Sequence, residues 1–190
     1  GALHAVSVTA SGYTSGQSVS FFQGAKGAES WRRARRIGVG SSITLEHLMA
    51  SSALPFIFPA VRIHREYFGD GSMRQVAPIS PALHLGAERV LVIGTSRGLN
   101  AGAPEREKTT AYPTLAQIAG HALNSIFLDG LELDIERMQR INNTVRLITP
   151  EQRVRHRLSL REVEVLVLSP SEEIDLVAEK FAAALPAAGR

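Results

Sequence analysis

The sequence contains no cysteine among its 190 residues. This absence excludes a disulfide framework, a thiol nucleophile and thiolate metal sites. The sequence also lacks an apolar stretch of the ~20 residues needed for a transmembrane helix, and its N-terminus has neither a charged region nor a signal-peptide cleavage site. We therefore expect a soluble, cytoplasmic chain, with peripheral contact with a membrane left open.

Charge of either sign is moderate, and hydrophobic residues make up 44% of the chain, so one domain with a substantial core is expected. The net charge is +3, and the basic residues cluster in Trp31–Arg36 and Arg153–Arg157. A solvated face is one interpretation of both runs, and attraction to anionic lipid headgroups is the other. Neither aromatic interleaving nor zinc-ligand spacing accompanies them, so nucleic acid is not an expected partner.

Strand-like and helix-like segments alternate along the chain, which predicts an α/β layered structure with a mostly parallel sheet. The Arg89–Gly94 run is typical of a strand buried on both faces. Residues 99–113 form a predicted flexible surface loop. The other expected strands are 3–9, 18–22, 144–149 and 163–168, and the expected helices are 44–52 with Thr44 as N-cap, 79–86, 115–141 with a kink at Gly130, and one from Ser171.

An isolated acid, Asp70, lies between Gly69 and Gly71 in the most informative segment of the chain. Glycine permits a left-handed backbone and leaves space beside the carboxylate open. A turn-forming aspartate is the plain interpretation of this pattern. The functional interpretation is a carboxylate that receives a proton, because the turn lies between core segments, where an unpaired carboxylate is costly.

Other motifs give weaker indications of chemistry. Gly94–Gly98 has the Gly-x-Ser-x-Gly spacing of a nucleophile elbow around Ser96, but Gly102 and Pro104 prevent the helix that should follow. The six histidines show no zinc-binding spacing, so surface or core-edge positions are expected for them and no metal site is predicted. Gly38–Gly40 lacks the strand, helix and acid of a dinucleotide site, and no cofactor is predicted.

Three blocks of the sequence resemble bacterial patatin-like phospholipases. They are Glu46–Val61, with its Ala-Ser-x-Ala-x-Pro pattern, then Tyr67–Ala82, with Asp70-Gly71-Ser72 in place of Asp-Gly-Gly, and Leu85–Gly94. The resemblance extends through Phe127–Arg137 and Ser169–Glu173 and so covers most of the chain.

The resemblance implies a lipid acyl-ester hydrolase with a Ser-Asp dyad, in which Asp70 acts as base towards a serine hydroxyl and no histidine is needed. In that family a Gly-rich loop and a Gly-x-Ser-x-Gly elbow precede the aspartate, and neither is present ahead of Gly1. Residues 1–190 are therefore expected to be the C-terminal portion of a single patatin-like domain, in a layered fold with a mostly parallel central sheet flanked by helices and incomplete at its N-terminal side. The chain alone is expected to be inactive.

Two alternatives stay open. One is a non-catalytic membrane-associated or assembly domain, in which the basic runs bind anionic lipid and an exposed sheet edge pairs with another chain. The other is an esterase that uses Ser96 as its own nucleophile. The expected partners are thus an acyl-ester substrate, an anionic membrane surface and a second chain at the sheet edge.

Overall fold

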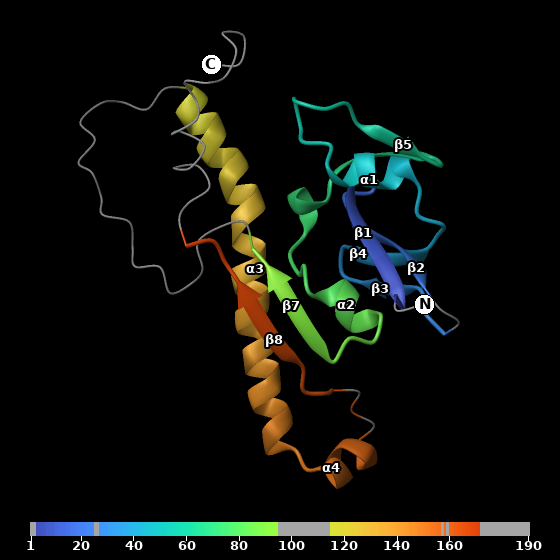
Figure 1. The fold of residues 1–190 in the computed structure, drawn as a ribbon, viewed down its shortest axis with the longest axis vertical. Helices are drawn as coiled ribbons and strands as arrows, with labels where there is room; N and C mark the ends of the chain where they lie inside the picture. Colours follow the sequence, from blue (N-terminus) through green and yellow to red (C-terminus); the bar gives the residue numbers. More distant parts are fainter. Residues whose placement is uncertain (1–2, 25–26, 95–114, 157, 159, 172–190) are drawn as a thin grey trace, which may run out of the picture.

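The computed structural model describes residues 3–24, 27–94, 115–156, 158 and 160–171, and for 115–129 it describes the backbone alone. The described chain is a mixed α/β structure (Figure 1). Its elements are β1 (Ala5–Gly12), β2 (Ser18–Gly24), β3 (Trp31–Arg33), β4 (Arg36–Gly40), α1 (Leu45–Ser51), β5 (Val61–Ile63), β6 (Glu66–Asp70), the 3₁₀ helix η1 (Gly71–Arg74), α2 (Ser80–His84), β7 (Arg89–Ile93), α3 (Leu115–Leu147), α4 (Pro150–Arg155) and β8 (Glu164–Leu168).

The larger sheet has six strands in the order β3-β4-β2-β1-β6-β5, and it is mostly antiparallel. Only the β2–β4 pair within it is parallel. The prediction of a mostly parallel central sheet was therefore wrong. Short connections such as Ala34–Arg35 and His64–Arg65 join neighbouring strands as hairpins, and a hairpin requires antiparallel pairing. A second sheet pairs β7 with β8 in parallel across the long α3 connection.

One face of the six-stranded sheet packs against α1. The apolar core between them contains Ala10, Val19, Phe21, Ala50, Ile63 and Phe68. The helix begins after Thr44, as predicted, and the Thr44 N–H donates to His47 Nδ1 at 3.1 Å. The ring of His47 is buried and meets Phe21 edge-on at 4.6 Å. His47 is thus a core histidine, and burial lowers the pKa of its imidazole.

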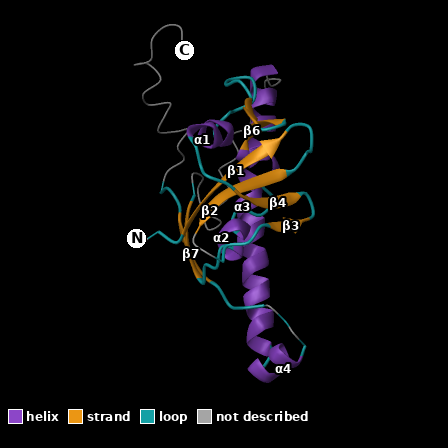
Figure 2. Cartoon of the chain, turned by 90° about the vertical axis from the view of Figure 1, so that its right-hand side faces the viewer, coloured by secondary structure: helices purple, strands orange, loops and turns teal. Residues whose placement is uncertain are grey.

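The opposite face of the sheet carries small polar residues and faces η1 and α2. The Ser11 hydroxyl donates to the Gly71 carbonyl, and the indole of Trp31 stacks between Phe22 and His84 with ring centroids at 5.1 and 4.7 Å. The His84 ring therefore joins α2 to the sheet. In Figure 2 the sheet lies in front of α3.

A second core lies along α3. Ile135 and Met138 of that helix pack with Ile79 and Val163, and with Val90 and Val92 of β7. The helix runs from Leu115 to Leu147 as one continuous element, which is longer than the sequence predicts. The predicted strand at 144–149 was wrong, because Val145 follows Ile141 and Met138 at helical spacing and is buried on the same face.

The strand β7 is buried on one face only. Leu91 and Ile93 are 56% and 75% exposed, whereas Val90 and Val92 pack in the α3 core. The expectation of burial on both faces was therefore wrong for the described chain. The run of β-branched residues predicted the strand correctly but carried no information on how many layers cover it.

At Gly130, helix α3 lies in close contact with the backbone of Gln75. A Cβ at this position would lie 2.5 Å from the carbonyl oxygen of Gln75, which is too close for a real side chain. Gly130 thus lets α3 approach the chain just after η1. The predicted kink at this residue does not interrupt the helix.

Among the described helices, none combines the length and apolarity needed to cross a lipid bilayer. The loop predicted at 99–113 and the helix predicted from Ser171 onward fall outside the described residues, apart from Ser171 itself.

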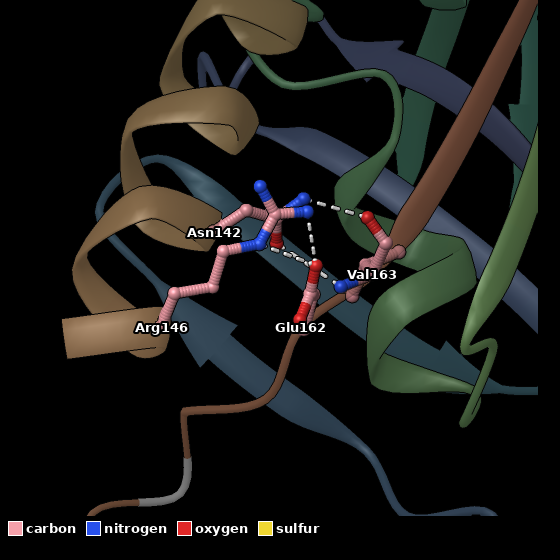
Figure 3. Close-up of polar contacts among 4 residues, drawn as sticks. All are labelled: Asn142, Arg146, Glu162 and Val163. Atoms are coloured by element: carbon pink, nitrogen blue, oxygen red, sulfur yellow. Dashed lines mark hydrogen bonds and ion pairs between the residues drawn. The ribbon is translucent and has the colours of Figure 1, made fainter. Parts of the chain in front are cut away.

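The segment before β8 is fixed to α3 by side chains (Figure 3). The Asn142 amide donates to the Val163 carbonyl at 2.7 Å and accepts from the Val163 N–H at 3.0 Å. Arg146 forms an ion pair with Glu162 one turn further on, and both side chains are largely exposed. The Asn142 side chain is partly buried. Its loss would leave the N–H and C=O groups of Val163 without hydrogen-bond partners.

Replacing Asn142 therefore has a larger effect than replacing Arg146. We expect Asn142→Ala to lower the free energy of unfolding by about 1–3 kcal/mol, because it leaves the Val163 N–H and C=O unpaired. Arg146→Ala should cost no more than about 1 kcal/mol, since an exposed ion pair contributes little. Urea denaturation measures both. Equal losses, or a larger loss for Arg146→Ala, would contradict this account.

The start of α2 depends on a buried acid of α3. Asp134 is 5% exposed, and its Oδ2 accepts from the Ile79 N–H at 3.0 Å. Burial raises the pKa of this carboxyl, although the Ile79 N–H and nearby Arg137 and Arg36 act in the opposite direction. The native state therefore holds the Asp134 proton to a higher pH than the unfolded chain does.

This pKa shift predicts a pH-dependent effect of Asp134→Asn. As the pH rises through the window between the ordinary carboxyl pKa and the raised one, the wild-type chain loses stability, because the folded state binds more protons there. The amide oxygen of asparagine still accepts from Ile79 but never ionises. We expect the Tm of Asp134→Asn relative to wild type to be higher at pH 7 than at pH 3.5. Glu132→Gln, at an exposed position of the same helix, is the control. A difference that shrinks as the pH rises would contradict the shift.

Candidate functional site

Asp70 is the last residue of β6 and the N-cap of η1. The side chain is buried, with 7% of the residue exposed. One carboxylate oxygen, Oδ1, accepts from the Ser72 N–H at 2.9 Å and from the Ser72 hydroxyl at 2.7 Å. No described residue hydrogen-bonds to the other oxygen, Oδ2. Among the described residues, the carboxylate is thus held through Oδ1 alone.

The backbone of Asp70 is anchored on two sides. Its N–H donates to the Ala53 carbonyl at 3.0 Å, which ties it to the end of the α1 segment. Its strand pairs with β1 through three residues, with Asp70 opposite Ala10. The acid therefore lies where β6 leaves the sheet, between α1 and η1.

Gly69 and Gly71 flank this acid through close packing. Neither has a positive φ, so the expected left-handed backbone was wrong as a reason for these glycines. A Cβ on Gly71 would overlap the carbonyl group of Thr9, and a Cβ on Gly69 would overlap the Tyr13 ring. Backbone cannot move aside, whereas a Tyr ring at the surface can. Only Gly71 is therefore fixed by its surroundings.

A cleft of about 990 Å³ opens beside the site. Strand β1 forms one wall, α1 contributes Leu48, and η1 contributes Gly71 and Ser72. Pro78, Pro81, Ala82 and Leu85 line the side formed by α2 and its flanks. Asp70 itself does not line the cleft, but the two residues that follow it do. A volume near 1,000 Å³ is at the upper end of the range for binding pockets.

Ser72 is the residue that sequence reasoning missed. Its hydroxyl contacts the Asp70 carboxylate, and the residue lines the cleft. The sequence does carry a signal for this contact, because an Asp followed two residues later by Ser favours a local side-chain turn. That signal predicts a structural hydrogen bond as readily as a catalytic one.

The remaining candidates that fall within the described residues do not join this site. Ser96 lies outside the described residues. No described histidine side chain hydrogen-bonds to Asp70, and the imidazole of His47 bonds to Thr44 and Ser41 instead. The Trp31–Arg36 run forms the β3–β4 hairpin, and the run that starts at Arg153 ends α4. In the part of the chain that the structure covers, no three His, Asp or Glu residues are grouped to hold a metal ion.

Substitution by alanine should have different effects on stability at Gly71 and at Gly69. We expect Gly71→Ala to destabilise the fold by about 1–3 kcal/mol, because the new methyl group meets the Thr9 carbonyl. Gly69→Ala should cost less than about 1 kcal/mol, since the Tyr13 side chain can rotate away. Thermal unfolding of both variants measures the difference. If Gly69→Ala is the more damaging of the two, the packing described here is contradicted.

Comparisons with known proteins add no family to these observations. No protein-family model matches the sequence, and neither the curated proteins nor the solved structures show a match to it. The resemblance to patatin-like enzymes thus stays a prediction that rests on the sequence motifs.

Proposed function

We propose that Asp70 is the base of a Ser-Asp dyad in a patatin-like lipid acyl-ester hydrolase. The observation that carries the proposal is a buried carboxylate with one oxygen fixed by Ser72 and the other free of described partners, beside a large cleft. A fixed carboxylate with a free oxygen is suited to accept the proton of a serine hydroxyl. The patatin-like layered fold is part of the same proposal.

The chemistry proceeds in two steps. Asp70 Oδ2 accepts the proton of the serine hydroxyl as the serine oxygen attacks the ester carbonyl, and the alcohol leaves with a proton from Asp70. Water then attacks the acyl-enzyme while Asp70 accepts one of its protons. The acid product departs, and the serine hydroxyl is regenerated.

In this proposal the nucleophile and the oxyanion donors lie outside the described residues. Amide N–H donors directed at the developing oxyanion stabilise the transition state strongly. Among the described elements, no helix of eight or more residues starts at the cleft to supply such donors. The chain therefore contributes the base and one wall of the site. The cleft has apolar residues such as Leu48 and Leu85 that would contact the acyl chain, and polar residues such as Ser51, Ser52 and Gln75 that would contact the headgroup.

Asp70→Asn in the full-length protein tests the dyad. Hydrolysis of p-nitrophenyl butyrate should fall by about 10²–10⁴-fold in kcat, because asparagine keeps the shape and the Ser72 contact but cannot accept the proton. Asp134→Asn is the matched control, since it removes a buried carboxylate that holds α2 and lies outside the site. The circular dichroism spectrum confirms that both variants fold. Activity retained in Asp70→Asn would refute the dyad.

The hydrogen bond between Ser72 and Asp70 supports a second candidate function, an esterase in which Ser72 itself is the nucleophile. The 2.7 Å contact and the position of Ser72 on the cleft both favour it. Ser72→Ala decides between the two. The dyad with an external serine predicts that Ser72→Ala retains most of the activity, whereas the second candidate predicts that the activity is abolished.

A further inference from the structure

Helix α1 is capped at its start by a histidine. His47 is the third helical residue after the N-cap Thr44, and its Nδ1 accepts from the Thr44 N–H at 3.1 Å. Capping boxes usually carry Glu or Gln at this position. Helix α4 of the same chain has the usual form, because Gln152 Oε1 accepts from the N–H of its N-cap Thr149 at 3.0 Å. Of these two caps, that of α1 is the one whose acceptor can take up a proton near neutral pH.

The contacts of the His47 ring determine which of its nitrogens carries the proton. Nδ1 accepts a backbone N–H, so the proton of the neutral ring lies on Nε2. The Ser41 hydroxyl oxygen lies 3.5 Å from Nε2 and donates its own proton to the Ser42 carbonyl, so it can accept from Nε2. The Thr44 hydroxyl lies 2.9 Å from Nδ1 and donates to Glu46. A second proton would turn Nδ1 into a donor that faces the Thr44 N–H, and the cap therefore requires the neutral imidazole.

The surroundings of His47 also oppose a charge on the ring. The residue is 5% exposed, and its ring meets that of Phe21 edge-on. Burial lowers the pKa of the imidazole, while the charge of Glu46 raises it and that of His64 lowers it by smaller amounts. Among the described residues, these are the titratable groups that act on the ring, Glu46 from α1 itself and His64 from the β5–β6 turn. A proton on His47 thus removes a hydrogen bond and places a positive charge in the core.

The other end of α1 holds the backbone of Asp70. The Ala53 N–H donates to the Ala50 carbonyl at 3.3 Å, and the Ala53 carbonyl accepts from the Asp70 N–H at 3.0 Å. Both alanines are almost fully buried. Because α1 has only seven residues, it depends on its cap and its packing to stay folded. Loss of the cap at one end of α1 therefore loosens the anchor of Asp70 at the other.

A row of aromatic rings joins the same two points through the core. Phe21 meets the His47 ring at 4.6 Å and the Phe68 ring at 5.4 Å, both edge-on. Phe68 lies on β6, two residues before Asp70. Helix α1 also lines the cleft, through Leu48 among others. A shift of the His47 ring thus reaches both the strand that carries the acid and the wall of the cleft.

We propose that His47 is a positioning residue whose neutral imidazole keeps α1 folded and Asp70 in place, and that a proton on Nδ1 releases both. The unfolded chain binds this proton at a higher pH than the folded chain does. The stabilisation by His47 is therefore complete above the ordinary histidine pKa of about 6.5 and is lost as the pH falls through the lowered one. Resting on the proposed function, this switch sets the acid limit of hydrolysis.

Nuclear magnetic resonance of the wild-type protein tests the cap without any substitution. The nitrogen-15 shifts of the His47 ring at pH 7.5 should show the Nε2–H tautomer. As the ring takes up its second proton, the hydrogen-exchange protection factors of the Leu48 and Asp70 amides should fall together, by at least about tenfold. A proton on Nδ1 at pH 7.5 would overturn the cap. A protection factor of the Asp70 amide that stays constant would overturn the link to the site.

His47→Gln is the matched variant, because glutamine keeps an acceptor for the Thr44 N–H and does not titrate in this range. Loss of the ring beside Phe21 lowers its Tm at every pH, so the readout is the change with pH. Between pH 7.5 and pH 5, kcat/KM of wild type for p-nitrophenyl butyrate should fall at least about threefold more than that of His47→Gln. His156→Gln, at the exposed end of α4, is the control and should follow wild type. The same pH profile in wild type and His47→Gln would overturn the proposal.

The switch and the dyad fail separately. Full activity of Asp70→Asn would refute the dyad, whereas pH-dependent protection of the Asp70 amide in wild type, absent in His47→Gln, would support the switch whatever the activity. An inactive Asp70→Asn variant together with a pH-independent Asp70 amide in wild type would keep the dyad and overturn the switch.

Discussion

The contact between Gly71 and the carbonyl of Thr9 determines the geometry around the site. It brings the start of η1 against β1 at the residue where β6 stops pairing, and it allows no side chain between them. Because β6 stops there, Asp70 becomes both the end of a strand and the cap of a helix. The same stop leaves the first half of β1 without a described neighbouring strand on that side.

The position of the acid follows from this arrangement. Three anchors hold it: the Ala53 carbonyl on the backbone, the pairing with Ala10, and Ser72 on the side chain. A buried carboxylate needs hydrogen bonds, and two from Ser72 satisfy one oxygen. The other oxygen has none from a described residue. Asp134 also bonds to described residues through one oxygen alone, but that bond holds the start of α2, whereas the bonds of Asp70 go to Ser72 beside the cleft.

Local patterns predicted much of the fold, and tertiary packing decided the rest. Strands β1, β2 and β8, and helix α1 with Thr44 as its cap, were predicted because alternation and capping are local properties. The pairing direction was wrong because hairpins formed where crossovers were expected. Residues 144–147 joined α3 because Val145 packs beside Met138. Asp70 was found from its glycines and its family resemblance, but the open edge of β1 and the role of Ser72 required the positions of η1 and β6 in space.

The central proposal is that Asp70 activates the serine of a Ser-Asp dyad. The most direct measurement is to treat the full-length protein with a fluorophosphonate and to map the modified residue by peptide mass analysis. The account predicts one adduct, on a serine other than Ser72 and Ser96, that forms in wild type and Ser72→Ala and fails to form in Asp70→Asn. An adduct on Ser72 or Ser96, or one that forms as fast in Asp70→Asn as in wild type, would contradict it.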